Sequence, residues 1–338
     1  MPTQTPKLNV ILGVSDEETP NLSRSNRYVG ALMRKLAEDP DKTFLITAKG
    51  LKRTSQSIPA VALISHYMLH GALADDALGL DELYQIFLLI LFVLVIDDHM
   101  DTRLDPRIHS VAQVQEYADR LLHCTEQGEL DDDDAIIRYI ARVTARLRAY
   151  PVFECYAEVY FQALRAMLDG MVSEFRNRDP SATDLDQYMR YAAHSVGTNI
   201  GLTASLIVLG DRSLADRTDR LWVTLDIVAS IIRFSNDIRS YEREIAEGKF
   251  SSLILAAQKF GIDLERVHES INQQDILRII RALMIADVYD LKDCVTYLDS
   301  GGHFEAVIVN AVLGVVCLYE EADFHTLVLS SAEPDAGT

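Results

Sequence analysis

The sequence is short of basic residues. Its 32 Lys and Arg side chains stand against 51 Asp and Glu side chains, which gives a formal net charge of −19. Nucleic acids and anionic membrane surfaces are bound through basic protein surface, so the composition argues against both as partners. An anionic small molecule is not excluded, although it would need metal ions and a few well-placed Lys or Arg side chains.

Cysteine is also scarce. The four cysteines lie far apart, without a CxxC pair or a zinc-ligand spacing: Cys124, Cys155, Cys294 and Cys317. Scattered thiols are typical of a reducing cytoplasm and argue against a disulfide framework. No basic and then apolar leader opens the chain, so we expect no secretory signal. The apolar run 86–96 is about half as long as a membrane span, so we expect a cytoplasmic protein without membrane insertion.

Period-two alternation of apolar and polar residues, the mark of a half-buried strand, is missing. A βαβ rhythm, an internal repeat and a linker are missing too, as are the GxGxxG, P-loop, HExxH and GxSxG motifs. Nearly every long segment has helical periodicity instead. We therefore predict one all-α domain of about ten helices over 21–325, between a flexible lead-in (1–20) and a disordered tail (326–338).

One expected helix, 80–103, carries an unbroken apolar run into a cluster of carboxylates: Asp97, Asp98 and Asp101. On a helix Asp97 and Asp101 share a face, and Asp98 lies about 100° round. Buried carboxylates repel one another unless a cation meets them. Ligands that offer only oxygen favour Mg²⁺ first and Mn²⁺ second. The alternative is a core helix that ends in solvated acids.

A second cluster lies far along the chain, within SNDIRSYEREIAE. Asn236, Ser240 and Glu244 are spaced i, i+4 and i+8, so each lies about 40° round the helix from the one before. An amide oxygen, a hydroxyl and a carboxylate would then form one stripe of oxygen ligands. The alternative is that these residues belong to a polar, solvent-exposed face of the helix with ion pairs along it. Asn and Ser are poor helix formers, and nothing in the local sequence explains their presence within this helix. Their presence weakens that alternative.

Taken together, the segments DDHMD and NDIRSYERE resemble the DDxxD and NDxxSxxxE motifs of class I terpene synthases. Their separation, 139 residues from Asp97 to Asn236, also resembles that family. The resemblance implies a class I terpenoid synthase fold, an α-helical barrel with the two motifs facing each other across its mouth. It also implies that the motifs hold three Mg²⁺ ions, with Mn²⁺ as a substitute, on a prenyl diphosphate substrate.

Two basic residues extend the resemblance. Arg190, 46 residues before Asn236, resembles the diphosphate-sensing Arg of many bacterial members, and Lys249 resembles a basic residue that also reaches the diphosphate. The family's helix break after that Arg corresponds to 193–197, where Gly197, His194 or Ser195 would take its role. The chain departs from the family at its end: no Arg follows Arg281, so the C-terminal Arg-Tyr clamp is missing or built differently.

The apolar cavity that the resemblance implies would be walled by Phe92 and Val93, one turn before the first motif. Aromatic rings could stabilise a carbocation there, although each is also a candidate for plain core packing: Phe87, Phe92, Phe153, Tyr156, Tyr160, Tyr191 and Trp222. An inward-pointing Phe92 would favour farnesyl diphosphate, a C15 substrate. The segment NDIRSYEREIAEGKFSSL resembles kaurene-synthase-like diterpene synthases, and on it we predict a C20 substrate.

That C20 substrate would be geranylgeranyl diphosphate or a bicyclic diphosphate derived from it. The one formal match to a DxDD cyclase motif, 131–134, is interpreted as a helix start, so the chain is not expected to make the bicycle itself. A prenyl chain-elongating synthase is the first alternative, but beyond DDxxD only Lys49, Lys52 and Arg53 hint at a second diphosphate site. A non-enzymatic helical scaffold with solvated acids is the second. A homodimer is left open.

Overall fold

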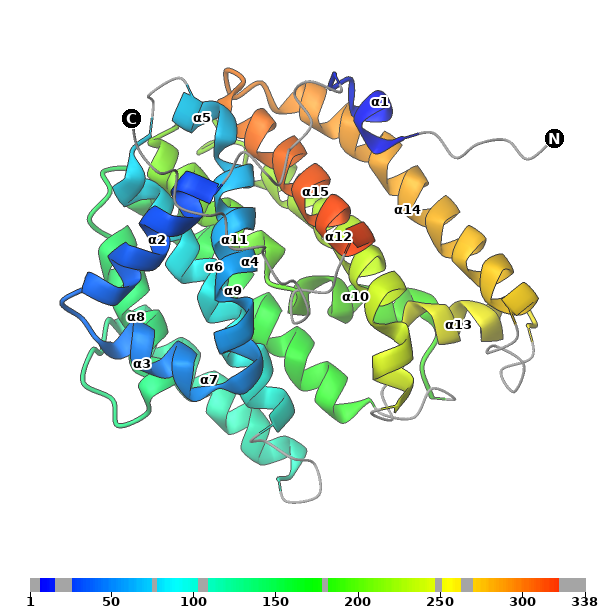
Figure 1. Ribbon diagram of the computed structural model, residues 1–338, viewed down its shortest axis with the longest axis horizontal. Coiled ribbons are helices and arrows are strands. Elements are labelled where there is room, and N and C mark those ends of the chain that lie inside the picture. Colours follow the sequence, from blue (N-terminus) through cyan, green and yellow to red (C-terminus); the bar gives the residue numbers. More distant parts are fainter. Residues whose placement is uncertain are drawn as a thin grey trace, which may run out of the picture.

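The computed structural model describes residues 7–15, 26–74, 78–102, 109–177, 182–246, 251–262 and 270–321. These residues form fifteen helices and no strand, and the helices pack around one hydrophobic core (Figure 1). The predicted all-α fold is thereby confirmed. The helices are α1 (Leu8–Leu12), α2 (Asn26–Glu38), α3 (Thr43–Gly50), α4 (Lys52–Met68), α5 (His70–Ala74), α6 (Leu80–Thr102), α7 (Val111–Gln127), α8 (Ala135–Leu147), α9 (Phe153–Arg176), α10 (Leu185–Ser195), α11 (Thr198–Leu209), α12 (Thr218–Ala246), α13 (Ser252–Lys259), α14 (Ser270–Leu298) and α15 (His303–Glu321).

The number of helices exceeds the predicted ten because long periodic segments are broken. Leu69 alone separates α4 from α5, and Val196 and Gly197 separate α10 from α11. The segment TFLITA (43–48), which by sequence alone could be a strand or a short helix, is helical and belongs to α3. The acidic run 131–134 does start a helix, since the Asp134 carboxylate accepts the backbone N–H groups of Ile136 (2.7 Å) and Ile137 (3.2 Å) at the beginning of α8.

Helix α6 lies at the centre of the molecule, packed against α2, α3, α4, α8 and α11. Its apolar run is buried almost throughout because it is hydrophobic on every side, as a helix surrounded by others must be. The Tyr139 hydroxyl of α8 donates a hydrogen bond to the carbonyl oxygen of Leu88 (2.9 Å), which joins α8 to this helix. Both α6 and α12 run toward the lower edge of Figure 1, so the two motifs lie at the same end of the bundle.

Helices α9 and α10 approach each other closely at Gly170. A Cβ atom at this position would lie 2.6 Å from the carbonyl oxygen of Tyr191 and 3.0 Å from the backbone nitrogen of Ser195. Only glycine allows two helix backbones to come this near. The contact fixes the position of α10, which carries Arg190, against α9.

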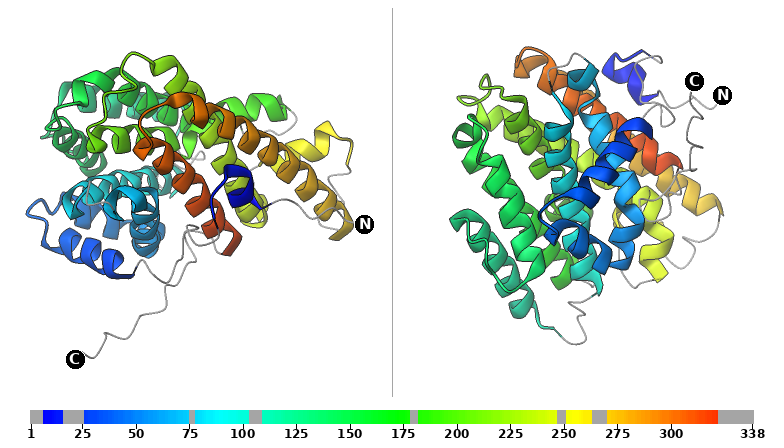
Figure 2. Two further views of the ribbon diagram at one scale, coloured as in Figure 1. Left: turned by 90° about the horizontal axis from the view of Figure 1, so that it is seen from above. Right: turned by 60° about the vertical axis from the view of Figure 1, so that its left-hand side comes forward.

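The expected lead-in 1–20 contains a short helix, α1. Ile11 is buried, and α1 packs on α14 and α15, as Figures 1 and 2 show for the dark blue helix beside the orange ones. Gly13 ends α1 in the left-handed region, at φ 76°. The apolar residues of LNVIL therefore add a turn of helix to the core.

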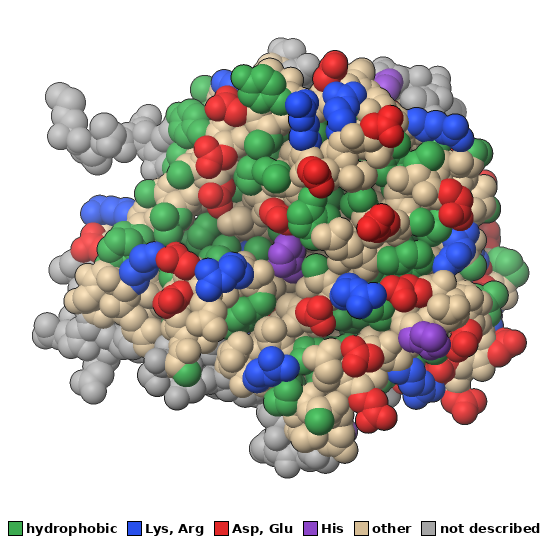
Figure 3. Space-filling view, turned by 180° about the vertical axis from the view of Figure 1, so that it is seen from behind, with side chains coloured by type: hydrophobic (Ala, Val, Ile, Leu, Met, Phe, Trp, Pro, Cys, Tyr) green, Lys and Arg blue, Asp and Glu red, His purple; other side chains and the backbone are tan. Residues whose placement is uncertain are grey.

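The described surface mixes charges of both signs. On the face shown in Figure 3, Lys and Arg side chains are interspersed with Asp and Glu, without a basic patch. By length and composition α15 could cross a bilayer, and 56% of its 303–320 window is buried inside the structure. The four cysteines are free thiols.

Candidate metal and diphosphate site

The two adjacent aspartates at the end of α6 lie in different surroundings. Asp97 is half-buried, whereas Asp98 is fully buried. The Oδ2 atom of Asp98 accepts the backbone N–H of Thr54 (3.1 Å) and lies 3.3 Å from the Thr54 hydroxyl. Thr54 is in the first turn of α4, where backbone N–H groups have no partner within the helix. Asp98 thus caps α4, whose own N-cap residue, Leu51, offers no side-chain hydrogen bond.

The second cluster lies on α12 as predicted by its spacing. The Asn236 side chain is half-buried and donates a hydrogen bond from Nδ2 to the Tyr319 hydroxyl (2.8 Å). Ser240 is buried, and its hydroxyl donates a hydrogen bond to the backbone carbonyl oxygen of Asn236 (2.8 Å). Both residues therefore direct protons toward protein acceptors. The Asn236 Oδ1 and the Ser240 hydroxyl oxygen are both hard ligands of the kind that Mg²⁺ takes, so the two residue types fit this ion.

The remaining predicted ligands lie outside the described side chains. They are Asp101, whose backbone belongs to α6, and Glu244, whose backbone belongs to α12. Among the side chains that the structure does describe, no three His, Cys, Asp or Glu lie close enough together to hold a metal ion. The ligand roles of all six residues stay predictions.

A buried ionic network lies beside the second motif. Asp237 is fully buried, and its Oδ1 lies 2.7 Å from the Nε of Arg233. Its Oδ2 accepts a hydrogen bond from the Tyr188 hydroxyl (3.1 Å) and from the backbone N–H of Ser252 (2.8 Å). Arg233 also pairs with Glu174 of α9 (2.7 Å) and donates to the Tyr188 hydroxyl. This network fixes α12 against α9, α10 and the start of α13.

The predicted diphosphate ligands are only partly described. Arg190 is exposed on α10, about 200° round the helix from the buried Tyr188, and forms no ion pair with a described residue. Lys249 lies outside the described residues. Tyr191 is half-buried, and its ring meets that of Tyr188 edge-on, with 5.6 Å between centroids. Burial raises the pKa of Tyr191 to about 12, so its hydroxyl keeps its proton at neutral pH.

A helix break lies where 193–197 was expected to hold one. Helix α10 ends at Ser195, α11 begins at Thr198, and the two meet at a bend of 41°. Gly197 occupies the left-handed region at φ 69°, and a Cβ there would lie 2.6 Å from both methyl carbons of Val93. Gly201 stays helical within α11. The side chain of Val93, one turn before Asp97, therefore packs directly on the break.

Two aromatic residues proposed for the cavity pack against protein. Phe92 is fully buried with its ring centroid 6.0 Å from that of Tyr139, on the side of α6 that faces α8. Trp222 stacks on His194, with 6.2 Å between centroids and 22° between planes. Trp222 precedes Asn236 by fourteen residues, roughly 21 Å along α12. Their predicted contact with substrate is untested.

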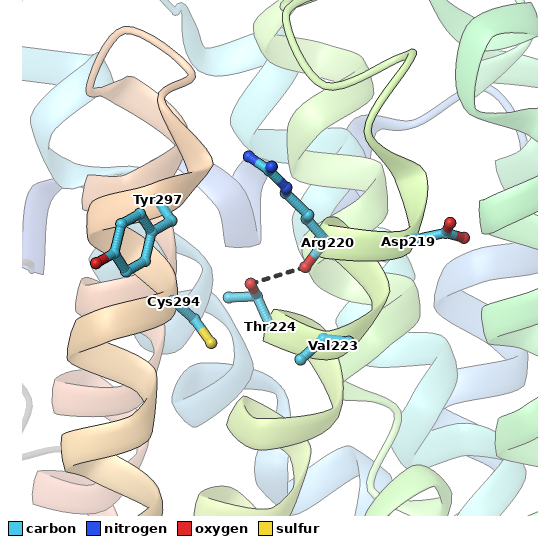
Figure 4. Close-up of a pocket in the computed structure, with 6 residues that line it drawn as sticks. All are labelled: Asp219, Arg220, Val223, Thr224, Cys294 and Tyr297. Atoms are coloured by element: carbon cyan, nitrogen blue, oxygen red, sulfur yellow. Dashed lines mark hydrogen bonds between the residues drawn. The ribbon is translucent and has the colours of Figure 1, made fainter.

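A pocket of about 430 Å³ lies between α12 and α14 (Figure 4), and its α12 residues belong to the opposite end of that helix from the second motif. It is lined by Asp219, Arg220, Val223, Thr224, Cys294 and Tyr297. Even Thr224 precedes Asn236 by twelve residues, roughly 18 Å along the helix. This pocket is therefore separate from the candidate metal site.

Three partners of the site residues were not predicted from the sequence. Thr54, Tyr319 and Arg233 contact Asp98, Asn236 and Asp237 respectively. For Arg233 the i, i+4 spacing to Asp237 was a readable signal. Tyr319 follows a buried leucine rather than an arginine, so a search for an Arg-Tyr pair does not find it.

Comparisons with known proteins give a family and a fold. The family model described as terpene synthase family 2, C-terminal metal binding, matches residues 88–274, which are 187 of the 338 residues. No curated protein matches the sequence. A similar solved structure is 2-methylisoborneol synthase from Streptomyces coelicolor A3(2) in complex with Mg²⁺ and 2-fluoroneryl diphosphate, with a TM-score of 0.68, 12% identity and coverage of 90% of this chain and 93% of that one. Another is linalool/nerolidol synthase from Streptomyces clavuligerus, with a TM-score of 0.63, 13% identity and coverage of 88% and 95%.

Proposed function

The chain belongs to the terpene synthase family, and from this premise we propose that it is a class I enzyme that ionises and cyclises a C20 prenyl diphosphate. The proposal rests on one observation. The side-chain amide N–H of Asn236 donates to the Tyr319 hydroxyl, which turns the Asn236 amide oxygen, an atom that can bind a hard cation, away from that contact. Membership in this family favours cyclisation over chain elongation and over a non-enzymatic scaffold.

In the proposed mechanism the metal ligands are the six oxygen-bearing residues of the two motifs: Asp97, Asp98, Asp101, Asn236, Ser240 and Glu244. Bound Mg²⁺ would neutralise the charge that develops on the diphosphate leaving group. Arg190 and Lys249 would donate hydrogen bonds to the same group. The carbon–oxygen bond breaks, its electron pair leaves with the diphosphate, and an allylic carbocation remains.

The carbocation must be kept from water until it cyclises. Val93 and the break at Gly197 offer apolar surface one turn below Asp97. Aromatic faces would stabilise positive charge through their quadrupole, and Tyr191 and Trp222 are the half-buried candidates on α10 and α12. Cyclisation ends when the last cation loses a proton or takes up water.

The C20 assignment is supported by the likeness of NDIRSYEREIAEGKFSSL to diterpene synthases. The only side-chain argument for a C15 substrate was an inward-pointing Phe92. The contact of that ring with Tyr139 on the α8 side of α6 weakens the argument. The substrate is then geranylgeranyl diphosphate or a bicyclic C20 diphosphate, and farnesyl diphosphate is the alternative.

The test is incubation with C10, C15, C20 and bicyclic C20 diphosphates and Mg²⁺, followed by gas chromatography of the hydrocarbons. We expect turnover of a C20 substrate, and a loss of orders of magnitude in Asp97→Asn and Asn236→Ala without loss of the folded state. Arg190→Ala should impair ionisation more than folding. Efficient turnover of the C15 substrate alone would overturn the C20 assignment, and near-wild-type activity of Asp97→Asn would overturn the mechanism.

A further inference from the structure

Tyr319 lies in the last turn of α15, where α15 packs against α12. Its hydroxyl accepts a hydrogen bond from the Nδ2 of Asn236 at 2.8 Å. The backbone carbonyl oxygen of the same asparagine accepts a hydrogen bond from the Ser240 hydroxyl, also at 2.8 Å. One hydrogen bond therefore joins the C-terminal helix to the side chain of a predicted ligand, and another joins the backbone of that ligand to Ser240.

The two ends of an asparagine amide have opposite chemistry. The oxygen accepts hydrogen bonds and binds cations, whereas the nitrogen donates and does not bind them. A half-turn about the Cβ–Cγ axis exchanges these ends, and the neighbouring groups decide which orientation is populated. Because the Nδ2 of Asn236 bonds to Tyr319, the Oδ1 atom is turned away from α15.

We propose that Tyr319 is a positioning residue for the metal site: its hydroxyl accepts the amide N–H of Asn236 while the amide oxygen binds the ion. This inference rests on the proposed function, because it assumes that Asn236 is a ligand. Without the hydroxyl, the orientation that binds metal would leave a half-buried N–H against an apolar ring, and that orientation becomes less favourable. Groups that orient metal ligands in this way affect metal affinity strongly.

The direct test compares Tyr319→Phe with Tyr84→Phe. The second variant is a matched control because the Tyr84 hydroxyl donates a 2.8 Å hydrogen bond to Asp39, near the opposite end of α6 from Asp97. Mn²⁺ binding is measured by electron paramagnetic resonance in the presence of inorganic diphosphate. We expect Tyr319→Phe to raise the Mn²⁺ Kd by about 10–100-fold, and Tyr84→Phe to leave it unchanged.

A double-mutant cycle separates a role in orienting the amide from a general structural role. In Asn236→Asp the ligand presents oxygen at both ends, so no N–H needs an acceptor. In that background Tyr319→Phe should change the Mn²⁺ Kd by less than about twofold. The steady-state prediction is similar: the Mg²⁺ concentration for half-maximal rate rises in Tyr319→Phe, while kcat at saturating Mg²⁺ changes less.

The outcomes are distinguishable. If the wild-type protein does not bind Mn²⁺ with diphosphate, the proposed function fails. If it does, and Tyr319→Phe binds equally well, the inference about Tyr319 fails. A loss that is equally large in the Asn236→Asp background, or a Tyr319→Phe variant that is unfolded without metal, would mean that Tyr319 is structural and does not orient the amide.

Discussion

At the scale of single residues, a buried group of charges lies beside the second motif. Arg233 is the only cation that the described structure brings to both Glu174 and Asp237. Asp237 is fully buried, so its charge depends on this partner and on hydrogen bonds from Tyr188 and Ser252. Removing one member of a buried ionic group leaves the others uncompensated, which costs more than the group contributes as a whole.

We predict that Arg233→Met lowers the free energy of unfolding by about 3–5 kcal/mol. Urea unfolding followed by circular dichroism measures the change. Arg239→Met is the control, because Arg239 is on the same helix but exposed, and its loss should cost less than about 0.5 kcal/mol. Equal losses in the two variants would contradict the importance of the network.

His66 gives the fold a dependence on pH. It is buried in α4, and its ring stacks on that of Tyr28 at a centroid distance of 4.4 Å. Burial, and after it the positive charges of His70 and Arg27, together lower the pKa of His66 from 6.5 to about 4. Because the unfolded chain takes up this proton at higher pH than the folded one, the stabilisation is complete above pH 6.5 and is lost as the pH falls toward 4.

We therefore predict that the wild-type protein loses up to about 3 kcal/mol over this interval through His66. His66→Phe keeps an aromatic ring for the stack but cannot titrate. Its Tm should fall less than that of the wild type between about pH 7 and pH 5. Parallel Tm profiles for the two proteins would show that His66 is not responsible.

At the scale of elements, the break between α10 and α11 depends on one glycine. Gly197 has φ 69°, and both methyl carbons of Val93 and the sulfur of Met167 occupy the space where a side chain would begin. A residue with a Cβ would meet two penalties there, a left-handed backbone and a collision with α6 and α9. The break and the wall of the proposed cavity are thus set by the same residue.

We predict that Gly197→Ala lowers the free energy of unfolding by at least about 2 kcal/mol, since the left-handed conformation alone costs about 1–2 kcal/mol. Gly30→Ala is the control, because Gly30 is helical and the nearest atom to its would-be Cβ is the flexible end of Arg34 at 3.5 Å. That change should stabilise α2 by about 0.5–1 kcal/mol. Urea midpoints of the two variants should therefore move in opposite directions, and movement in the same direction would contradict the account.

The sequence predicted the long helices well and the interruptions poorly. Helix α6 spans Leu80–Thr102 against the predicted 80–103, and the second cluster lies on a helix as predicted, because an apolar run and a polar stripe can be recognised from sequence spacing alone. Gly197 and Gly201 look alike in sequence, yet only Gly197 takes up a left-handed conformation and breaks the helix. The side chains of Val93 and Met167, from two other helices, pack against this position. The cap of α4 could not be identified from the sequence, since it is the carboxylate of Asp98 from another helix.

At the scale of the whole molecule, the first and last helices of the described chain lie together. Ile11 of α1 is buried against α14 and α15, although 1–20 was predicted to be a flexible lead-in. A polar stretch with one short apolar patch does not indicate that this patch will pack against helices far away in the sequence. The same limit applies to Tyr319, whose contact with Asn236 spans 83 residues.

We predict that deletion of residues 1–13 lowers the free energy of unfolding by about 2 kcal/mol, mainly through the lost burial of Ile11. Deletion of residues 1–6, which ends before α1, is the control and should leave the urea midpoint unchanged. If both deletions have the same effect, the packing of α1 on α14 and α15 contributes nothing measurable.

The hydrogen bond between Asn236 and Tyr319 also sets an order of events during synthesis. A ribosome that adds about 5–20 residues per second needs roughly 4–17 s to travel from the codon of the first residue to that of the second. For most of that interval the nascent chain already contains both motifs, but the Tyr319 hydroxyl that we propose orients the amide of Asn236 has not yet been synthesised. We therefore expect the nascent chain to bind divalent cations weakly until the last turn of α15 has emerged from the ribosome.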